Sequence, residues 1–443
     1  MVLGWHCLST LAIRVTASDD VLMVVKNGAQ GRIVIIGGGT AGTIVANRLR
    51  RSLPAGSWHI TVIDRDDRHL YQPGLLFVPF RRRGPRRLTK PRHRYLARGV
   101  DLLQGDVEHV DPQGRVITLV DGRDCAYDFL IIASGTSPRP DRTPGLLGPH
   151  WRQSIFDFYT LDGALALRRA LEDWRGGRLV VHVVDMPIKC PVAPLEFCFL
   201  ADAYFTRRHV RATTQITYVT PLDGAFTKPV AASRLQTLLD RRSIGVEADF
   251  VTDFVDADRR EVVSMDERRV PYDLLVTVPL NMGADFVGTS GLGDELNYIP
   301  VDRGTLTAKE WNNIFVIGDA ADIPTSKAGS TAHFAAHTVV ANLLAKIQGR
   351  EPEDRFDGHA NCFVETGRGK GLLIDFNYDV EPLPGRFPMR KLGPFPLLAE
   401  SPINHLGKLG FRWMYWHLLL RGRPLPIPDR MSMSGKQQPS PRS

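Results

Sequence analysis

The sequence predicts an α/β protein built from two copies of one strand–helix–strand unit, and three observations support this fold class. Continuous apolar runs at 32–36 and 178–184 are typical of parallel strands that are buried on both faces. The two units close on similar segments, 127–132 (YDFLII) and 272–278 (YDLLVTV). A chain of 443 residues also exceeds the size at which one hydrophobic core usually stops growing. We therefore expect at least two domains.

The first unit consists of a strand, a glycine-rich turn, a helix and a second strand. Its first apolar run leads directly into 37–42 (GGGTAG), and the helix is expected over 44–51. The segment 59–63 (HITVI) is rich in β-branched residues, which favours a strand, and it ends on Asp64. A later strand at 130–132 runs into small residues, and the prolines that follow predict a linker.

The second unit begins with a helix expected over 161–174 and continues with the apolar strand at 178–184. A strand at 314–317 with a helix of small residues after it returns the chain to the first unit. The segment 404–420 interleaves aromatic, aliphatic and basic residues and predicts a helix of about five turns.

The turn after the first strand has the glycine spacing of a dinucleotide-binding loop. The first glycine permits a tight turn, the second lets the backbone approach a pyrophosphate, and the third lets helix pack closely on strand. The helix N-terminus favours the anionic ligand. The loop residues are Gly37, Gly39, Thr40, Ala41 and Gly42. Asp64, about 20 residues further on, is placed to accept hydrogen bonds from ribose hydroxyls. A glycine-rich turn without a ligand is the alternative.

The pair Gly318-Asp319 after a late strand resembles the second flavin fingerprint of two-domain flavoprotein reductases. This resemblance implies that the dinucleotide is FAD. Lys327 is then a candidate to lie near the flavin pyrimidine edge, where a cation stabilises the reduced flavin, and a surface lysine is the alternative. The other expected cofactor-binding residues are Val107, Ala133, Ser134 and Gly135.

A nicotinamide dinucleotide would need a second glycine-rich turn, in the second unit. No glycine occurs between Gly177 and Gly224, and three prolines after the strand at 178–184 remove backbone donors. The segment 185–196 (DMPIKCPVAPLE) instead carries Cys190. We expect a cysteine to replace the NAD(P)H site.

Composition and charge restrict the partners. The 56 Lys+Arg outnumber the 48 Asp+Glu, giving a formal charge of +8, which favours an anionic partner. Much of the excess lies within 81–94, where few aromatics occur, so a solvated loop near anionic lipid is favoured over nucleic-acid binding. No apolar run reaches the roughly 18 residues of a membrane span. Residues 1–30 lack a secretory signal and predict a disordered extension, with Met23 as an alternative start.

The five cysteines are too few for a disulfide scaffold and lack the CxxC pairs of a zinc site. We expect Cys198 to be a core residue and Cys125 to lie on a surface hairpin. His333 and His337 lie four residues apart on a predicted helix, but no third ligand accompanies them. We therefore expect packing or surface roles for the two histidines, and no bound metal.

Several segments resemble the sulfide:quinone reductase family, which is related to flavocytochrome sulfide dehydrogenases and type II NADH dehydrogenases. The resemblance covers about residues 31–420. The segments that carry it are 71–77 (YQPGLLF), Lys189-Cys190 with Glu196, 324–327 (PTSK), and Cys362-Phe363 with Gly367 and Gly369.

The resemblance implies that Cys190 and Cys362 form a redox pair beside FAD that holds the sulfur of sulfide, and that Glu196 relays protons. Lys189 is expected to lower the pKa of Cys190. Two ordinary buried cysteines are the alternative. Electrons would pass to a membrane quinone near the aromatic residues Phe363, Phe376 and Tyr378. Some family members have a third redox cysteine, but 153–157 (QSIFD) has none, which implies a two-cysteine mechanism.

The tail resembles the family's amphipathic membrane anchor, and Trp413, Tyr415 and Trp416 suit the lipid headgroup boundary. The alternative is a helix packed on the body of the protein. We expect a peripheral, monotopic enzyme on the cytoplasmic face of a membrane, with sulfide or a persulfide as donor, a quinone as acceptor and no nucleic-acid partner. A homo-oligomer is left open.

The expected domains are a disordered extension (1–30), the first part of an FAD-binding domain (31–150), a second Rossmann-like domain with Cys190 (151–300), a return segment of the FAD-binding domain with Cys362 (301–380) and a membrane-associating region (381–443). Three other functions remain as alternatives. They are a type II NADH:quinone reductase, a flavoprotein that handles thiol persulfides, and a flavin-binding sulfide sensor without turnover.

Overall fold

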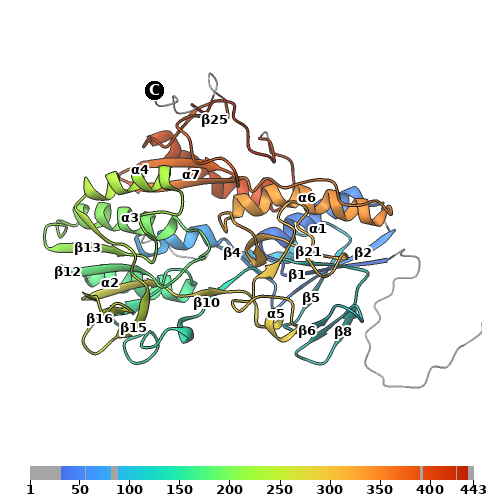
Figure 1. Cartoon of the computed structure of the whole chain (residues 1–443), viewed down its shortest axis with the longest axis horizontal. Coiled ribbons are helices and arrows are strands. Elements are labelled where there is room, and N and C mark those ends of the chain that lie inside the picture. Colours follow the sequence, from blue (N-terminus) through green and yellow to red (C-terminus); the bar gives the residue numbers. More distant parts are fainter. Residues whose placement is uncertain (1–30, 55, 81–87, 390–392, 426, 438–443) are drawn as a thin grey trace, which may run out of the picture.

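The computed structural model describes residues 31–54, 56–80, 88–389, 393–425 and 427–437. The predictions for 1–30 and for the arginines at 81–87 lie outside these residues. The chain forms two halves, each built on a five-stranded sheet, and its C-terminal segments lie along one edge of both halves (Figure 1).

The first sheet is parallel throughout and brings together strands that are far apart in the sequence. In spatial order its strands are β21 (Ile314–Val316), β9 (Phe129–Ile132), β1 (Gly31–Ile36), β2 (Trp58–Asp64) and β5 (Val100–Gln104). The central strand β1 is buried on both faces, as its apolar sequence predicts. Helices α1 (Thr40–Ser52) and α6 (Gly329–Ile347) pack against each other beside this sheet. The position of β21 confirms the predicted return of the chain to the first unit.

In spatial order, the strands of the second sheet are β11 (Ile155–Phe156), β18 (Leu274–Val278), β12 (Gly177–Val183), β13 (Thr214–Val219) and β14 (Ile244–Glu247). The second sheet repeats the order of four strands of the first, but its fifth strand, β11, precedes the other four in the sequence, whereas β21 follows its four. The helices of this half are α2 (Leu161–Asp173), α3 (Ala193–Arg207) and α4 (Pro229–Asp240). The side chain of Thr160 caps α2 by accepting a hydrogen bond from the Gly163 N–H at 3.0 Å.

The two halves repeat one unit down to individual contacts. Each half inserts a three-stranded antiparallel sheet before its closing parallel strand. These insertions are β6 (Val107–Asp111), β7 (Val116–Leu119) and β8 (Asp124–Ala126) in the first half, and β15 (Thr252–Asp256), β16 (Glu261–Ser264) and β17 (Arg269–Pro271) in the second. Asp128 accepts hydrogen bonds from the backbone and side chain of Arg32, and Asp273 does the same for Arg178. The predicted repeat is confirmed.

A separate four-stranded sheet carries Cys362. In spatial order its strands are β23 (Ala360–Gly367), β24 (Lys370–Phe376), β26 (Phe395–Leu397) and β25 (Gly385–Phe387). Its strand β23 packs against α3 of the second half. The prediction placed all of 301–380 with the first domain, but the hairpin of β23 and β24 forms this additional layer instead, because its apolar residues complete the core of the second half.

The C-terminal helix is shorter than predicted. Helix α7 (Pro402–Met414) begins where Ser401 accepts a hydrogen bond from the Asn404 N–H at 3.2 Å, and a π-helical turn, η6 (Tyr415–Leu419), follows it. Helix α7 packs on β23 and β24.

The remaining short elements are β3 (Arg68–Leu70), η1 (Gln72–Phe80), β4 (Thr89–Pro91), η3 (Arg92–Tyr95), β10 (Ser137–Pro138), η4 (Pro140–Arg142), β19 (Asn281–Met282), α5 (Asp285–Thr289), β20 (Ile299–Pro300), η5 (Gly318–Ala320) and β22 (Ala321–Asp322). Within the described residues, every helix is too short or too polar to cross a membrane.

Candidate active site

The glycine-rich loop between β1 and α1 has the geometry that a dinucleotide requires. Gly37 has a φ of +97°, and a Cβ there would lie 2.4 Å from the Ala133 carbonyl oxygen. A Cβ at Gly42 would lie 1.9 Å from the Gly37 carbonyl oxygen, whereas Gly39 faces open space. Helix α1 has no side-chain cap and no acidic residue in its first turn, so its N–H groups remain free for an anion.

Asp64 and Arg92 hold this loop from behind. The Asp64 carboxylate accepts a hydrogen bond from the Gly38 N–H at 2.7 Å and pairs with Arg92 at 3.0 Å. Burial raises the pKa of Asp64, and the charge of Arg92 opposes that rise. Arg92 also donates to the Gly38 carbonyl at 2.9 Å and is buried. The prediction of a solvated basic loop over 81–94 is wrong for Arg92, because its guanidinium is buried against the cofactor loop.

The second flavin segment meets the first one at the same cavity. Gly318 and Asp319 follow β21, and Lys327 donates to the backbone carbonyls of Asp319 and Ala321 at 2.9 and 3.0 Å. The Lys327 ammonium lies 4.1 Å from the centre of the Tyr298 ring. Burial lowers the pKa of Lys327 while the charge of Asp319 raises it, so the lysine is not the surface residue of the alternative interpretation.

These loops line a cavity of about 740 Å³. The wall contains the expected cofactor residues Gly37, Gly39, Thr40, Ala41, Asp64, Ala133, Ser134, Gly135, Gly318, Asp319 and Lys327, together with Cys190 and Glu196. Gly42 lies behind the loop, and Val107, on β6, packs against the core of the first half without reaching this wall.

The cavity fits FAD. Ser134 Oγ and Thr136 Oγ1 are buried and have no hydrogen-bond partner among the described residues, so they are available to a ligand. A second helix, α6, also points an uncapped N-terminus at the cavity, where Ala328 and Gly329 line the wall. Two helix N-termini suit a ligand with a negative pyrophosphate and a flavin that becomes anionic on reduction.

Cys190 lies between the second half and the flavin segment. Its N–H donates to the Lys327 carbonyl at 2.7 Å, and its carbonyl accepts from the Tyr159 hydroxyl at 3.3 Å and from the Ala193 N–H at 2.8 Å. Its φ of +51° is in the left-handed region, which costs energy for a residue with a Cβ. The surrounding bonds therefore hold the cysteine in a strained position beside the flavin loops.

Cys362 is the neighbour of Cys190, and both are free thiols. Cys362 lies on β23 and hydrogen-bonds with Ser330 at the start of α6. Burial raises the pKa of Cys362 to about 12, and burial together with the charge of Glu196 raises the pKa of Cys190 well above its usual range. The expected role of Lys189 is wrong, because its ammonium donates to the Thr136 carbonyl and Lys408 is the cation that lowers both thiol pKa values.

Glu196 belongs to a buried group of charges that the sequence analysis missed. It pairs with Lys408 of α7 and accepts a hydrogen bond from the Glu365 N–H at 2.5 Å. Lys408 also donates to the Phe363 carbonyl at 2.9 Å, and His405 pairs with Glu365 at 2.7 Å. Burial raises the pKa of Glu196, whereas the charge of Lys408 lowers it. His405 and Lys408 lie three residues apart in the predicted helix, and that spacing was the available signal.

The aromatic residues expected at a quinone do not line the cavity. Phe376 is buried in the core, Tyr378 packs on Phe356 of the first half, and Phe363 packs on Phe395. The apolar residues that line the cavity include Leu75 and Leu76 of η1, Phe158 and Tyr159 before α2, Phe411 of α7 and Tyr415 of η6.

Two aromatic residues expected at a lipid surface are instead buried. Tyr415 is 1% exposed and its hydroxyl lies 2.7 Å from both Thr40 Oγ1 and His69 Nε2. Trp416 is 2% exposed, and Lys90 lies over its ring. Only Trp413 of the three is exposed, because the π-helical turn after α7 directs the other two rings into the core.

His333, His337, Cys198 and Cys125 lie outside the lining of the cavity. His333 is buried 3.4 Å from Arg48, and His337 pairs with Asp429. Cys198 is completely buried, as expected, and Cys125 lies on the hairpin of β7 and β8. Within the described residues, no group of three His, Cys, Asp or Glu side chains could hold a metal ion.

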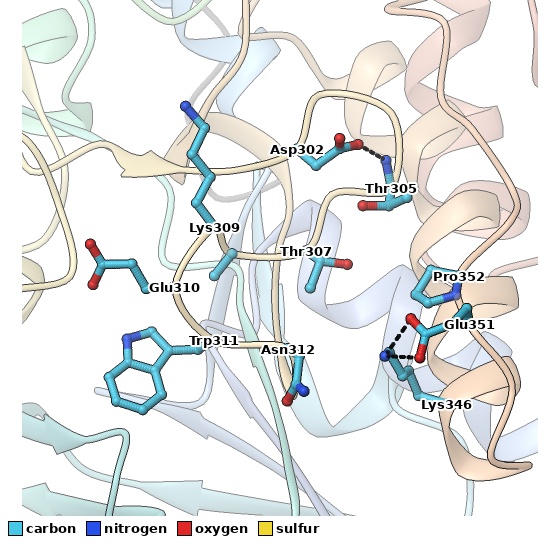
Figure 2. A pocket seen from close by; sticks show the side chains of 11 residues that line it. Asp302, Thr305, Thr307, Lys309, Glu310, Trp311, Asn312, Lys346, Glu351 and Pro352 are labelled. Carbon is cyan, nitrogen blue, oxygen red and sulfur yellow. Dashed lines mark hydrogen bonds and ion pairs between the residues drawn. The ribbon is translucent and has the colours of Figure 1, made fainter.

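A second hollow, of about 470 Å³, lies between the loop before β21 and the end of α6 (Figure 2). Figure 2 shows Lys346 paired with Glu351, and Asp302 accepting a hydrogen bond from the Thr305 N–H. The part of its lining that the structure describes contains no cysteine and no flavin segment. The redox chemistry therefore belongs to the larger cavity.

Comparison with known proteins identifies oxidoreductases that resemble this chain. Residues 31–183 match the family model of the pyridine nucleotide-disulphide oxidoreductases. The chain is 25% identical over 397 residues to the mitochondrial sulfide:quinone oxidoreductase of Mus musculus, covering 88% of this chain and 86% of that protein. It is 22% identical to the sulfide-quinone reductase of Aquifex aeolicus, covering 77% and 83% of the two chains. The crystal structure of the Aquifex enzyme shares the fold, with a TM-score of 0.74, 18% identity and coverage of 88% and 92%.

The fold and the cavity, together with these matches, define an FAD-dependent oxidoreductase. Over most of its length, the chain is similar to sulfide:quinone oxidoreductases.

Proposed function

We propose that this enzyme oxidises sulfide at Cys190 and Cys362 and passes two electrons through FAD to a quinone. The observation that supports this most directly is the position of Cys190, which lies on the wall of the flavin cavity where a second dinucleotide would otherwise bind. No glycine-rich turn follows β12, so the backbone there cannot approach a pyrophosphate. A type II NADH:quinone reductase is therefore disfavoured.

Different residues of the site bind FAD, react with sulfide and stabilise the thiolate. Bound FAD supplies a two-electron acceptor beside the thiols and a two-electron donor for the quinone. The glycine loop and Asp64 would hold its nucleotide part, and the N-terminus of α6 with Lys327 would stabilise negative charge on the reduced flavin. Hydrosulfide cleaves the disulfide that the oxidised cysteines form, which leaves a persulfide on one cysteine and a thiolate on the other. Lys408 stabilises that thiolate, because its charge lowers both thiol pKa values.

Glu196 is the proton carrier of the proposed mechanism. It is fully buried, lines the cavity, and has one carboxylate oxygen, Oε2, without a hydrogen-bond partner among the described residues. Burial raises its pKa, which favours the protonated form more than in an exposed carboxylate. It can therefore exchange protons with sulfur on one side and with the reacting quinone on the other.

We place the quinone at the apolar end of the cavity, between η1 and α7. Leu75, Leu76 and Phe411 line this end, and Tyr415 closes it beside the glycine loop. A quinone ring is flat and apolar with polar edges, so aliphatic and aromatic side chains with a nearby Lys408 suit it.

The outer face of α7 supports binding to a membrane surface, which is where a long-chain quinone resides. Ile403, Leu406, Leu409 and Trp413 are 41%, 62%, 37% and 62% exposed, and at 3.6 residues per turn they share one face of the helix. The opposite face carries Lys408 and Phe411 to the cavity. We propose a peripheral protein whose α7 lies in the lipid interface and opens the cavity toward it.

The test is anaerobic stopped-flow absorbance of the flavin. Wild-type enzyme mixed with sulfide is expected to lose its flavin absorbance and to regain it when a soluble quinone is added. Cys190→Ser and Cys362→Ser are expected to slow the bleaching at least a hundredfold. Cys125→Ser, on the β7–β8 hairpin, is the matched control and keeps the wild-type rate. Bleaching of all three variants at the wild-type rate contradicts the proposal.

A further inference from the structure

Helix α7 presents two titratable side chains to two buried carboxylates. Lys408 pairs with Glu196 of α3, and His405, one turn earlier, pairs with Glu365 of β23 at 2.7 Å. The side chain of Glu196 is 0% exposed and that of Glu365 is 2% exposed. Lys408 is 14% and His405 22% exposed, so His405 is the member of this group with most access to solvent.

Short contacts hold the four residues together. The backbone N–H of Glu365 donates to Glu196 Oε1 at 2.5 Å, which keeps the two residues side by side. One oxygen of the Glu365 carboxylate accepts from His405, and the other accepts from the Gly367 N–H at 3.2 Å. The other charged groups that face this cluster are Arg242, after α4, with its partner Glu400, and the thiols Cys190 and Cys362.

The proposed reaction requires a proton from solvent in every turnover. Written for hydrosulfide and a quinone Q, it is HS⁻ + Q + H⁺ → S⁰ + QH₂. Sulfur loses two electrons and stays on a cysteine as sulfane sulfur, while the quinone gains those electrons and two protons. One of the protons comes from hydrosulfide and the other from water. The carboxylate on the cavity wall, Glu196, is fully buried, so the second proton needs a path.

We propose that His405 and Glu365 form the entrance of a proton path that leads from solvent to Glu196 at the wall of the flavin cavity. This inference rests on the proposed function. His405 takes up a proton at its exposed side and passes it through Nδ1 to Glu365. Neither residue touches the cavity, and both act through Glu196.

The charge of Glu365 affects the proton affinity of Glu196, so the two carboxylates release protons in sequence. Burial raises the pKa of Glu196, and the charge of Glu365 raises it further. A proton that reaches Glu365 removes that charge, so Glu196 then releases its own proton toward the cavity more readily. Glu196 then regains a proton from the Glu365 carboxylate, which lies near enough for its charge to act on Glu196, and the pair returns to its starting state with one proton delivered.

The experiment measures how fast reduced enzyme is reoxidised by a soluble quinone. The holoenzyme is reduced with dithionite, so the result does not depend on the sulfur donor. His405→Gln keeps a hydrogen bond to Glu365 but cannot carry a proton. We expect its reoxidation rate to fall at least tenfold above pH 7, with a larger solvent deuterium effect and an unchanged KM for quinone and Tm. His417→Gln, an exposed histidine on η6, is the matched control and keeps the wild-type rate.

Two further readouts separate a proton path from a structural ion pair. Free imidazole in the buffer is expected to restore the rate of His405→Ala, because it replaces the missing proton carrier. In the resting holoenzyme, imidazole NMR is expected to show a lower pKa for His405 in Glu365→Gln than in wild type, because the neighbouring negative charge is gone.

The outcomes distinguish the two proposals. Fast reoxidation of both wild type and His405→Gln, with equal pH profiles, overturns the proton path alone. Wild-type enzyme that quinone does not reoxidise overturns the proposed function, and the path falls with it. A slow His405→Gln that imidazole does not rescue in the His405→Ala background, with a lowered Tm, also overturns the path, because His405 then serves only the fold.

Discussion

Lys408 is the residue on which the charge balance of the site depends. It is the cation that lowers the pKa of Cys190, Cys362 and Glu196 together. Replacing it with Met is expected to raise both thiol pKa values and to slow alkylation of the thiols by iodoacetamide at pH 8 by about tenfold, which corresponds to about one pKa unit. Labelling followed by peptide mass spectrometry measures this rate at each cysteine.

Lys408→Met alone leaves Glu196 without its partner, and breaking a buried pair costs about 3–5 kcal/mol of stability. The double variant Glu196→Gln with Lys408→Met removes both charges and is expected to recover most of that stability loss. Its thiols are expected to alkylate faster than those of Lys408→Met, because the charge of Glu196, which raises both thiol pKa values, is gone as well. Thiols that alkylate at the wild-type rate in Lys408→Met contradict the role given to Lys408.

Lys436 and Asp375 form a second buried ion pair, with both side chains 1% exposed. Burial raises the pKa of Asp375, but the hydrogen bond from His359 and the charges of His359 and Lys436 outweigh it, so the pKa lies below the usual range. An unfolded aspartate titrates near pH 4. The stabilisation is therefore complete above about pH 4 and is lost as the pH falls through the lower folded pKa.

At pH 7, Lys436→Met is expected to lower the free energy of unfolding by about 3 kcal/mol, because Asp375 stays buried with less compensation. Urea unfolding measures this loss. Lys370→Met, an exposed lysine on the same strand β24, is the control and is expected to change stability by less than about 0.5 kcal/mol. Equal stabilities of the two variants contradict the prediction.

At the scale of elements, the regular units were predictable and the faces of the last helix were not. The segment GGGTAG after an apolar strand predicts the β1–α1 turn, because only glycine fits where Gly37 and Gly42 meet backbone atoms. The absence of glycine after β12 likewise predicts that no nucleotide binds there, and Cys190 occupies that segment instead. Tyr415 and Trp416 are buried although the sequence predicts a lipid surface. Aromatic residues are common both at a lipid boundary and in a core, so their type does not distinguish the two.

The residues that complete the site were missed for one physical reason. Lys408 and His405 face inward because β23 and α3 bring buried carboxylates to α7, and Arg92 turns inward because the glycine loop offers it a carbonyl and a carboxylate. These partners are distant in sequence. A local pattern of basic residues therefore predicts solvent exposure, and only the tertiary contacts reverse it.

The outer face of α7 leads to a prediction about membranes. Leu406→Glu and Trp413→Glu each remove an apolar side chain that is 62% exposed. We expect each variant to bind anionic lipid vesicles about tenfold more weakly, since burying one such side chain contributes roughly 1.5–3 kcal/mol. Turnover with a soluble quinone is expected to stay unchanged. Vesicle flotation measures the binding.

Met265→Glu is the matched control, because Met265 is 69% exposed on the second half, away from α7. Its vesicle binding is expected to equal that of wild type. Equal loss of binding in all three variants would indicate a general effect of added negative charge and would contradict a role for α7.

At the scale of the whole molecule, buried neutral histidines make the fold sensitive to acid. Burial lowers the pKa of His69 to about 4 and those of His182 and His333 to about 3. An unfolded histidine titrates near pH 6.5. Because the folded pKa values are lower, their stabilisation is complete above about pH 6.5 and is lost as the pH falls toward the folded values.

Three such groups are expected to decrease stability by up to about 4 kcal/mol per pH unit between pH 6 and 5. Urea unfolding across this range measures the slope. His182→Asn removes one group and is expected to reduce the slope by about a third, although its stability at pH 7 is lower. An unchanged slope would show that His182 is protonated in the folded protein.

The architecture supports the proposal that one cavity serves both the sulfur donor and the quinone. Two copies of a dinucleotide-binding unit lie side by side, and the C-terminal segments cover the edge that they share (Figure 1). The first copy keeps its glycine loop, and the second replaces it with Cys190. The added sheet supplies Cys362, and α7 supplies Lys408. We propose that the FAD-binding domain comprises 31–150 with the return of the chain through β21 and α6, and that 360–376 belongs with the second domain.

The central claim is that sulfide, and not a nicotinamide nucleotide, reduces this flavoenzyme. The most direct measurement mixes wild-type holoenzyme anaerobically with sulfide, or with NADH at the same concentration, and follows flavin absorbance before and after a soluble quinone is added. We predict rapid bleaching by sulfide, recovery with quinone, and a rate with NADH at least a hundredfold lower. Rapid bleaching by NADH with no response to sulfide would contradict the account.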